Sequence, residues 1–321
     1  MTARNVRIAT RSSDLALNQA RIVESALTSQ GFTCEIVTFK TTGDKNLDQP
    51  LSEIGAKGLF THELEVALKK KKVDCCVHSL KDLPTELPDG LAIAAILTRE
   101  DPRDVVVLNR VTGADDLASL PPGSRVGTSS LRRRAQLAAR HPRLEVVELR
   151  GNVPTRLQKV ESGMVHGAIL AAAGLIRLGA TQRISEFLDA PDWLPAAGQG
   201  AIAVECRDDD SEMRQILAGL DHAATRREVT AERAFLAGLD GGCQVPIGAL
   251  ATNSLDGGMR LHGFVSDLAG REVVRGSIAL PDDSDPVEVG LGLAAELRTR
   301  GASSLLLALR EGTKFISPQP E

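Results

Sequence analysis

Aromatic residues are scarce in this chain of 321 residues, which has no Tyr, one Trp and seven Phe. Proteins bind single-stranded nucleic acids largely by stacking bases on aromatic rings, so little material exists here for such a surface. The formal net charge of −4 also argues against a polycation that neutralises phosphates. We therefore expect no nucleic-acid partner.

Cysteines at C-x-x-C spacing and long apolar runs are absent as well. The sequence has no C-x-x-C motif, and its odd set of cysteines favours neither a disulfide framework nor a metal site: Cys34, Cys75, Cys76, Cys206 and Cys243. No apolar run approaches the roughly 18 residues of a membrane helix. A strand-like segment begins at Asn5, which leaves no room for a signal peptide. We expect a soluble, cytoplasmic protein without a membrane contact.

Short apolar segments alternate with amphipathic segments through the first two-thirds of the chain. Strands are predicted at 5–10, 34–39, 73–80, 91–97, 104–108, 144–149 and 166–172. Helices are predicted from Ser12 or Ser13 to Gly31 and at 61–71, 130–140 and 153–163. This alternation indicates an α/β fold with open, mostly parallel sheets and helices on both faces. From Asp221 onward, two helices and three strands at 245–252, 259–266 and 272–280 predict a small α+β domain.

Residues 125–160 concentrate positive charge, with eight Arg and one Lys against two Glu, a balance of +7. The segments GTSSLRRR and RGNVPTR place small polar residues at predicted helix starts, where free N–H groups favour an anion. Arginines near these starts are predicted to bind a ligand with several carboxylates or phosphates: Arg132, Arg133, Arg150 and Arg156. Arg134, Arg140 and Arg143 are predicted to lie on a solvated helix face.

Two predicted strands carry polar groups at their carboxyl ends, the edge where open α/β sheets bind ligands. Arg11 ends the first strand, and Ser13 follows it as a helix cap, a ligand contact or both. Asp82 follows the strand at 73–80 and is either a proton donor and cation stabiliser or one half of an ordinary loop salt bridge. His78 is interpreted as structural.

Cys243 lies in the segment GGCQVPIG. The glycines before it give the backbone freedom, and Pro246 restricts the chain again just beyond it. A buried, inert thiol is the ordinary state of a free cysteine, yet a core cysteine needs no such backbone. An inert core position and a presented, functional thiol therefore both remain open.

Taken together, several motifs resemble the porphobilinogen deaminase (hydroxymethylbilane synthase) family. They run in the family's order from Ile8 to Leu250 and include IATRSSDLAL, VHSLKDLPTELPDGL, VGTSSLRRR, LRGNVPTRL, LPAAGQGAIAVECR and GGCQVPIGAL. The resemblance implies a transferase of heme and tetrapyrrole biosynthesis. Such an enzyme joins four porphobilinogen molecules with loss of ammonia and releases linear hydroxymethylbilane by hydrolysis. The alternative is a non-catalytic polyanion-binding protein with a periplasmic-binding-protein fold.

The resemblance also assigns roles to individual residues. It implies one dipyrromethane cofactor per chain, attached to Cys243 by a thioether, and a catalytic carboxylate at Asp82. Further cofactor contacts are implied for Lys57, Lys81, Ser13, Ser130, Arg132, Arg133 and Gly174. Substrate contacts are implied for Arg11, Phe60, Arg150, Arg156, Arg177 and Gln199.

Three domains are expected from the same resemblance. Domain 1 would comprise residues 1–98 and 197–217, with Asp82 and a lid at 42–60. Domain 2, at 99–196, would hold the arginines, and both would be doubly wound and related to periplasmic binding proteins. Domain 3, at 218–321, would be α+β and carry Cys243. We expect a monomer whose partner is porphobilinogen, a small molecule.

Overall fold

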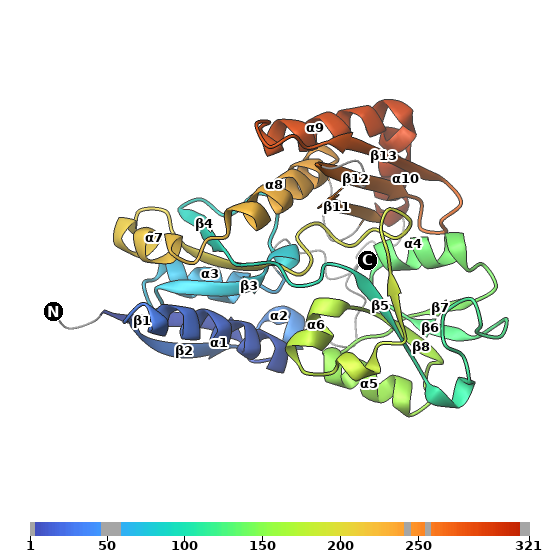
Figure 1. Ribbon diagram of the computed structural model, residues 1–321, viewed down its shortest axis with the longest axis horizontal. Coiled ribbons are helices and arrows are strands. Elements are labelled where there is room, and N and C mark those ends of the chain that lie inside the picture. Colours follow the sequence, from blue (N-terminus) through green and yellow to red (C-terminus); the bar gives the residue numbers. More distant parts are fainter. Residues whose placement is uncertain (1–3, 46–58, 241–244, 254–257, 315–321) are drawn as a thin grey trace, which may run out of the picture.

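The computed structural model describes residues 4–45, 59–240, 245–253 and 258–314 of the chain. Within them the strands form three sheets (Figure 1). Two five-stranded sheets, which we call sheet A and sheet B, lie side by side, and the three-stranded sheet C lies with its helices across the top of the view.

Sheet A has the strand order β2-β1-β3-β10-β4. Its strands are β1 (Asn5–Arg11), β2 (Thr33–Phe39), β3 (Cys75–Ser79), β4 (Leu91–Ile96) and β10 (Ile202–Arg207). The helices of this part are α1 (Asp14–Ser29), α2 (Thr42–Lys45), α3 (His62–Lys69) and α7 (Ser211–Ala218), with a 3-10 turn η1 at Leu80–Asp82. Separate apolar clusters, one containing Val23 of α1 and the other Leu64 of α3, fill the two faces of the sheet.

Sheet B repeats this arrangement with the order β7-β6-β8-β5-β9. Its strands are β5 (Asp104–Leu108), β6 (Arg125–Gly127), β7 (Glu145–Val147), β8 (Gly167–Ala171) and β9 (Glu186–Leu188). Its helices are α4 (Leu131–Arg140), α5 (Val153–Glu161) and α6 (Ala172–Arg177), with 3-10 turns η2 (Arg110–Thr112) and η3 (Thr181–Arg183). In each sheet the fourth strand in order, β10 or β5, runs antiparallel to its neighbours. The predicted mostly parallel α/β class is therefore confirmed.

The antiparallel strands, β5 and β10, are the first strands that the chain forms after it crosses from one sheet to the other. The chain leaves sheet A after β4 through residues 97–103 and returns from sheet B through residues 189–201. The Leu97 amide donates to the Ile202 carbonyl, and the Glu100 amide to the Gly200 carbonyl. Gly200 has a φ of +90°, and a Cβ on it would lie 2.3 Å from the Glu100 carbonyl oxygen, so this close crossing requires glycine. The domain boundaries themselves stay a prediction.

Sheet C is an antiparallel meander of β11 (Ile247–Asn253), β12 (Met259–Ser266) and β13 (Val273–Ala279). It packs against α8 (Ala223–Gly238) and α9 (Pro286–Leu297), as the predicted α+β domain requires. A π-helical segment, η4 (Arg298–Ala302), leads to α10 (Ser303–Lys314), which the sequence pattern does not predict. Leu305 and Leu306 of α10 complete the apolar core around Phe235.

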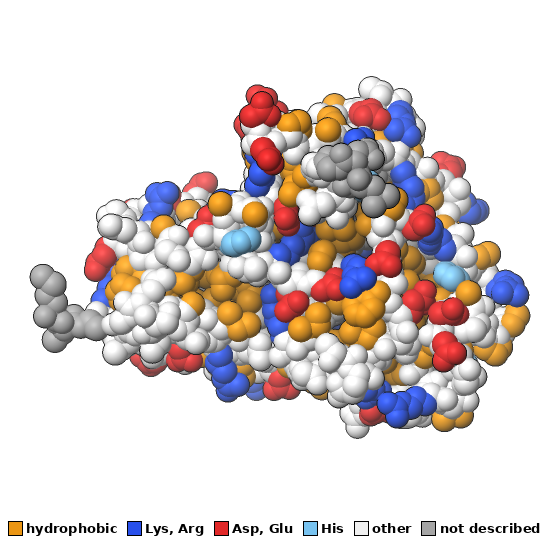
Figure 2. All heavy atoms as spheres, viewed as in Figure 1, with side chains coloured by type: hydrophobic (Ala, Val, Ile, Leu, Met, Phe, Trp, Pro, Cys, Tyr) orange, Lys and Arg blue, Asp and Glu red, His pale blue; other side chains and the backbone are white. Residues whose placement is uncertain are grey.

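Charged side chains of both signs are interspersed over the face of the molecule in Figure 2. The arginines predicted to lie on a solvated helix face are all exposed: Arg134, Arg140 and Arg143. For Arg143 the predicted helix face is wrong, because α4 ends at Arg140. Among the described residues, no helix combines the length and the apolar character needed to cross a membrane.

Candidate active site

The helix starts at the strand ends of both sheets are capped by the residues that the sequence indicates. Ser13 caps α1, and its hydroxyl oxygen accepts a hydrogen bond from the Ala16 amide. Ser130 caps α4, and Asn152 caps α5 by accepting from the Thr155 amide at 2.9 Å. These short polar side chains satisfy backbone donors that a helix start leaves free, so each helix begins at a defined residue.

A central cavity lies between sheets A and B, because residues from both sheets and from the returning crossing segment line it. Of the site residues expected from the sequence, it is lined by Lys81, Arg133, Arg156, Gly174, Arg177 and Gln199. Other lining residues are Leu15, Gln19, Ser79, Val153, Leu170, Ala171, Ala173, Gly200 and Ala201. The fold thus gathers cationic side chains from separate elements around one space.

The cationic groups of the central cavity lie where burial disfavours their charge. Burial, followed by repulsion from Arg133, lowers the pKa of Lys81 to about 8 and that of Arg156 to about 10. Burial also lowers the pKa of Arg177, whose guanidinium donates to the Gly200 carbonyl at 2.6 Å. A ligand that brings carboxylates into this cavity would supply the negative charge that these groups lack.

Asp82 lies in η1 directly after β3 and is partly buried. Its carboxylate counters the burial that lowers the pKa of Lys81 and, among smaller contributions, that of Arg156. Asp82 therefore interacts electrostatically with a cation of its own loop and with one that α5 supplies from the other sheet. Asp82 is not itself among the residues that line the central cavity, but it directly follows Lys81, which is. A carboxylate one residue from the cationic lining can act on a positively charged reaction centre.

A buried carboxylate at Asp104, which the sequence reasoning missed, organises the start of α4. Arg132 donates to it at 2.5 Å and Arg133 at 2.7 Å, and Trp193 and Gln199 also donate to it. Burial alone would raise the pKa of Asp104, but the two guanidiniums hold it well below its usual range. The sequence signal for this buried carboxylate was an Asp at the first position of the otherwise apolar strand DVVVL.

The two arginines differ in how they relate to the central cavity. Arg132 bonds to Asp104 and to the Leu194 carbonyl, and it does not line the cavity. Arg133 does line it, and its guanidinium reaches the Gln199 amide oxygen at 3.5 Å. Lys81 donates to the same oxygen at 3.2 Å. The predicted cofactor contacts of both arginines stay predictions.

Arg11 and Phe60 lie together at the edge of sheet A. The Arg11 guanidinium carbon is 4.3 Å from the centre of the Phe60 ring, a cation–π contact. A Cβ on Gly43 would lie 2.2 Å from this ring, so glycine allows the close approach. The Gly43 amide also donates to the Leu59 carbonyl, which joins the two described ends of the predicted lid. The lid itself, with Lys57, lies largely outside the described residues, as does Cys243.

Of two further polar residues near the site, Arg150 was predicted from the sequence and Gln19 was not. Arg150 precedes α5, and its carbonyl accepts from Lys159. Gln19 is buried on α1 and donates to the Ser79 hydroxyl at 2.8 Å, beside the cavity that both line. The signal for Gln19 was a polar residue on the apolar stripe of α1, between Leu15 and Val23.

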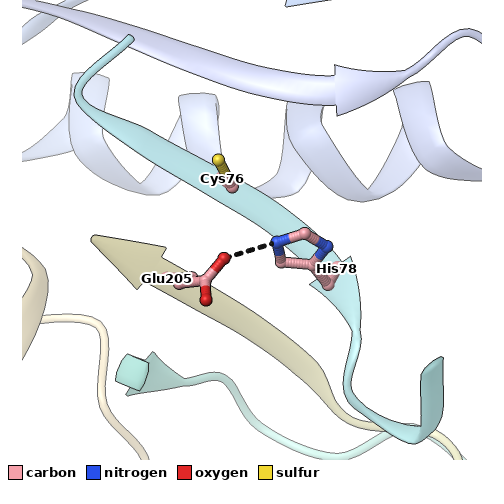
Figure 3. Close-up of side chains that lie close together, drawn as sticks. All are labelled: Cys76, His78 and Glu205. Atoms are coloured by element: carbon pink, nitrogen blue, oxygen red, sulfur yellow. Dashed lines mark hydrogen bonds and ion pairs between the residues drawn. The ribbon is translucent and has the colours of Figure 1, made fainter. Parts of the chain in front are cut away.

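His78 belongs to a buried cluster behind this site. Figure 3 shows His78 of β3 bonded to Glu205 of β10, with Cys76 nearby, and the three ligand atoms lie within 4.8 Å of one another. Zinc binds His, Glu and Cys side chains, but it binds cysteine only as the thiolate. Burial and the nearby Glu205 raise the pKa of the Cys76 thiol well above its usual value, and the thiol donates to the Leu64 carbonyl. His78 joins β3 to β10, in agreement with the structural role predicted.

Comparisons with known proteins bear on this site. The family model "Porphobilinogen deaminase, dipyromethane cofactor binding domain" matches residues 6–215, and "Porphobilinogen deaminase, C-terminal domain" matches residues 226–299. A porphobilinogen deaminase from Nitratidesulfovibrio vulgaris (strain DSM 19637 / Miyazaki F) is 47% identical over 304 residues, which are 93% of this chain and 95% of that protein.

Solved structures give weaker likenesses. A periplasmic substrate-binding protein of an ABC transporter from Coxiella burnetii is 15% identical, with 70% of this chain and 96% of that one covered and a TM-score of 0.42. A periplasmic binding protein from Salmonella typhimurium is 14% identical, with 70% and 93% covered and a TM-score of 0.38. The family models and the 47% identity are the decisive findings. The chain therefore belongs to the porphobilinogen deaminase family, whose members are hydroxymethylbilane synthases, transferases of tetrapyrrole synthesis with a dipyrromethane cofactor.

Proposed function

We propose that the central cavity binds the carboxylates of the dipyrromethane cofactor and of porphobilinogen. The observation that carries this proposal is the convergence of Lys81, Arg133, Arg156 and Arg177 on one cavity between the two sheets. Each pyrrole unit bears an acetate and a propionate, so a chain of such units is a polyanion. Guanidinium groups bind carboxylates with paired hydrogen bonds, which suits this ligand.

The residues around the cavity fit the cofactor by charge. Burial lowers the pKa of Lys81, Arg156 and Arg177, and carboxylates would offset that burial. Cys243 would hold the group through a thioether, which leaves a pyrrole α-carbon at the free end for the first addition. Arg132 and Ser130 would support Arg133, while Lys57, Ser13 and Gly174 would complete the cofactor contacts. Substrate would meet Arg11, Phe60, Arg150 and Gln199 as well as Arg156 and Arg177.

When bound, the dipyrromethane would supply a free pyrrole α-carbon, to which the aminomethyl carbon of porphobilinogen would form a carbon–carbon bond. Ammonia leaves from the aminomethyl carbon, and the α-carbon loses a proton. In this scheme Asp82 protonates the departing amine and then, as a carboxylate, stabilises the cationic substrate. After four additions, water releases the linear hydroxymethylbilane. The balance is four porphobilinogen and one water to one hydroxymethylbilane and four ammonia.

The alternative, a polyanion-binding protein without catalysis, would use the same cationic cavity. It gives no role to Asp82, the carboxylate that favours the charged forms of Lys81 and Arg156, and family membership does not favour it. The enzyme is proposed to act as a cytoplasmic monomer.

Replacement of Asp82 by Asn tests the catalytic assignment. The amide keeps the size of the carboxyl group but neither carries a proton to the amine nor bears charge, so kcat should fall about 100-fold or more. Steady-state kinetics with porphobilinogen measure the effect. Asp89→Asn, an exposed change in the same loop, should keep normal turnover. An active Asp82→Asn enzyme would show that the role is misassigned.

The covalent attachment is tested by the intact mass of the purified protein. The parent should exceed its sequence mass by two linked pyrrole units, because the thioether survives denaturation. Cys243→Ser should lack this surplus, whereas Cys34→Ser, a change of a partly buried cysteine in β2, should retain it. A surplus that persists in Cys243→Ser would place the anchor elsewhere.

Arg156→Leu tests the carboxylate-binding cavity. Loss of a charge-assisted hydrogen bond costs about 1.5–3 kcal/mol, so KM for porphobilinogen should rise about tenfold or more. The matched change Arg143→Leu removes an exposed arginine from the same basic segment and should leave KM unchanged. Equal KM values in the two variants would contradict the proposed cavity.

The lowered pKa of Lys81 predicts that the free energy of unfolding depends on pH in protein that carries no cofactor. Its pKa of about 8 in the folded state lies below the usual value of 10.5, so the unfolded chain binds more protons between these pH values. The free energy of unfolding of Cys243→Ser, relative to Cys243→Ser/Lys81→Met, should therefore rise from pH 8 to pH 10, as measured by urea unfolding. Cofactor carboxylates should keep Lys81 charged and remove the rise in the loaded protein. Parallel pH curves in the unloaded pair would refute this account.

A further inference from the structure

Helix α8 connects the C-terminal part of the chain to the loop that carries Asp82. It ends at Gly238, five residues before Cys243 in the sequence, and it packs against β4 of sheet A as well as against β11. Figure 1 shows α8 between sheet A and the elements around sheet C. One face of this helix therefore looks toward the Asp82 side of the molecule and the other toward the C-terminal core.

Arg233 of α8 reaches directly into the loop after Asp82. Its guanidinium donates to three successive carbonyl oxygens, those of Leu83 at 3.2 Å, Pro84 at 2.6 Å and Thr85 at 3.4 Å. Within the described chain, all hydrogen bonds of this guanidinium end on these oxygens, and burial lowers its pKa. A partly buried cation that is held by carbonyls alone, without a carboxylate, is costly to keep, which points to a positional role.

The other side of the Asp82 turn is held as well. Leu80 and Leu83, which flank Lys81 and Asp82, are buried in one apolar cluster with Val229 of α8. The Leu80 amide donates to the Ala201 carbonyl of the returning crossing segment. The turn thus has its first residue tied to the crossing segment and the residues after Asp82 tied to α8.

We propose that Arg233 is a positioning residue, which holds the Asp82 carboxylate at the reacting centre by clamping the carbonyls of residues 83–85. The inference rests on the catalytic role proposed for Asp82. Without the clamp the loop can shift, and displacements near 1 Å at a reacting group can cost about 100-fold in rate. The arginines proposed to bind substrate carboxylates lie in other segments of the chain (Arg11, Arg150, Arg156 and Arg177), so KM should be nearly unaffected.

The test compares Arg233→Met with Arg226→Met in the full-length enzyme with its cofactor attached, as checked by intact mass. Arg226 is a matched control because it lies on the same helix and donates to a sheet A carbonyl, that of Ala94 at 3.2 Å, two turns away from Arg233. We expect Arg233→Met to lower kcat at least about tenfold, with KM for porphobilinogen within about threefold of the parent. Arg226→Met should keep kcat within about twofold of the parent.

Arg233→Lys serves as the conservative variant and as a second measurement if Arg233→Met does not fold. Lysine keeps the charge and can reach a carbonyl but lacks the fork, so kcat should lie between those of Arg233→Met and the parent. A kcat for Arg233→Met, or for Arg233→Lys in its place, equal to that of Arg226→Met would overturn the inference. If that occurs while Asp82→Asn is inactive, the positioning role alone fails. If Asp82→Asn is itself active, the catalytic assignment fails first.

Discussion

The buried carboxylate of Asp104 is the interaction on which the rest of the site depends. It is fully inaccessible to solvent, and it accepts hydrogen bonds from two guanidiniums, an indole and an amide. These donors come from α4 and from the crossing segment 189–201 that leads from sheet B back to sheet A. Because Gln199 is fixed in this way, its amide oxygen can accept from Lys81, which also lines the cavity. One internal anion therefore orders a cationic site that repulsion would otherwise spread apart.

The remaining arginines of the central cavity, Arg156 and Arg177, are partly buried. Arg156 donates to the Gly151 carbonyl and Arg177 to the Gly200 carbonyl, but burial lowers the pKa of both. Such an arrangement costs stability in the empty protein and is recovered when a ligand supplies carboxylates. The site is thus complementary to polyanionic ligands before any of them is bound. Asp82 offsets part of the same burial by favouring the charged forms of Lys81 and Arg156.

Local signals in the sequence predicted much of the fold, whereas the long-range pairings had no local signal. The caps Ser130 and Asn152 follow from short polar residues before helical segments, and the exposure of Arg134 follows from helix periodicity. The partners of Asp104 could not be found in this way, because Arg132 lies 28 residues from it in the sequence and Gln199 lies 95 residues from it. Only the crossing of the chain between the sheets brings them together. The family resemblance assigned roles to Asp82 and Cys243 that spacing alone left undecided, and these roles stay predictions.

Arginine contacts of a different kind join the parts of the molecule to one another. Arg233 of α8 binds carbonyls of the loop between β3 and β4, and Arg226 of the same helix binds the Ala94 carbonyl of β4. Arg275 of β13 binds the carbonyls of Pro191 and Asp192 after β9. A guanidinium has several donors in a rigid plane, so carbonyl contacts fix orientation as well as distance. Apolar packing between the same parts would tolerate sliding, whereas these directional bonds do not. The C-terminal elements therefore hold both sheets in a defined relation, and one of their contacts, that of Arg233, lies on the residues directly after Asp82.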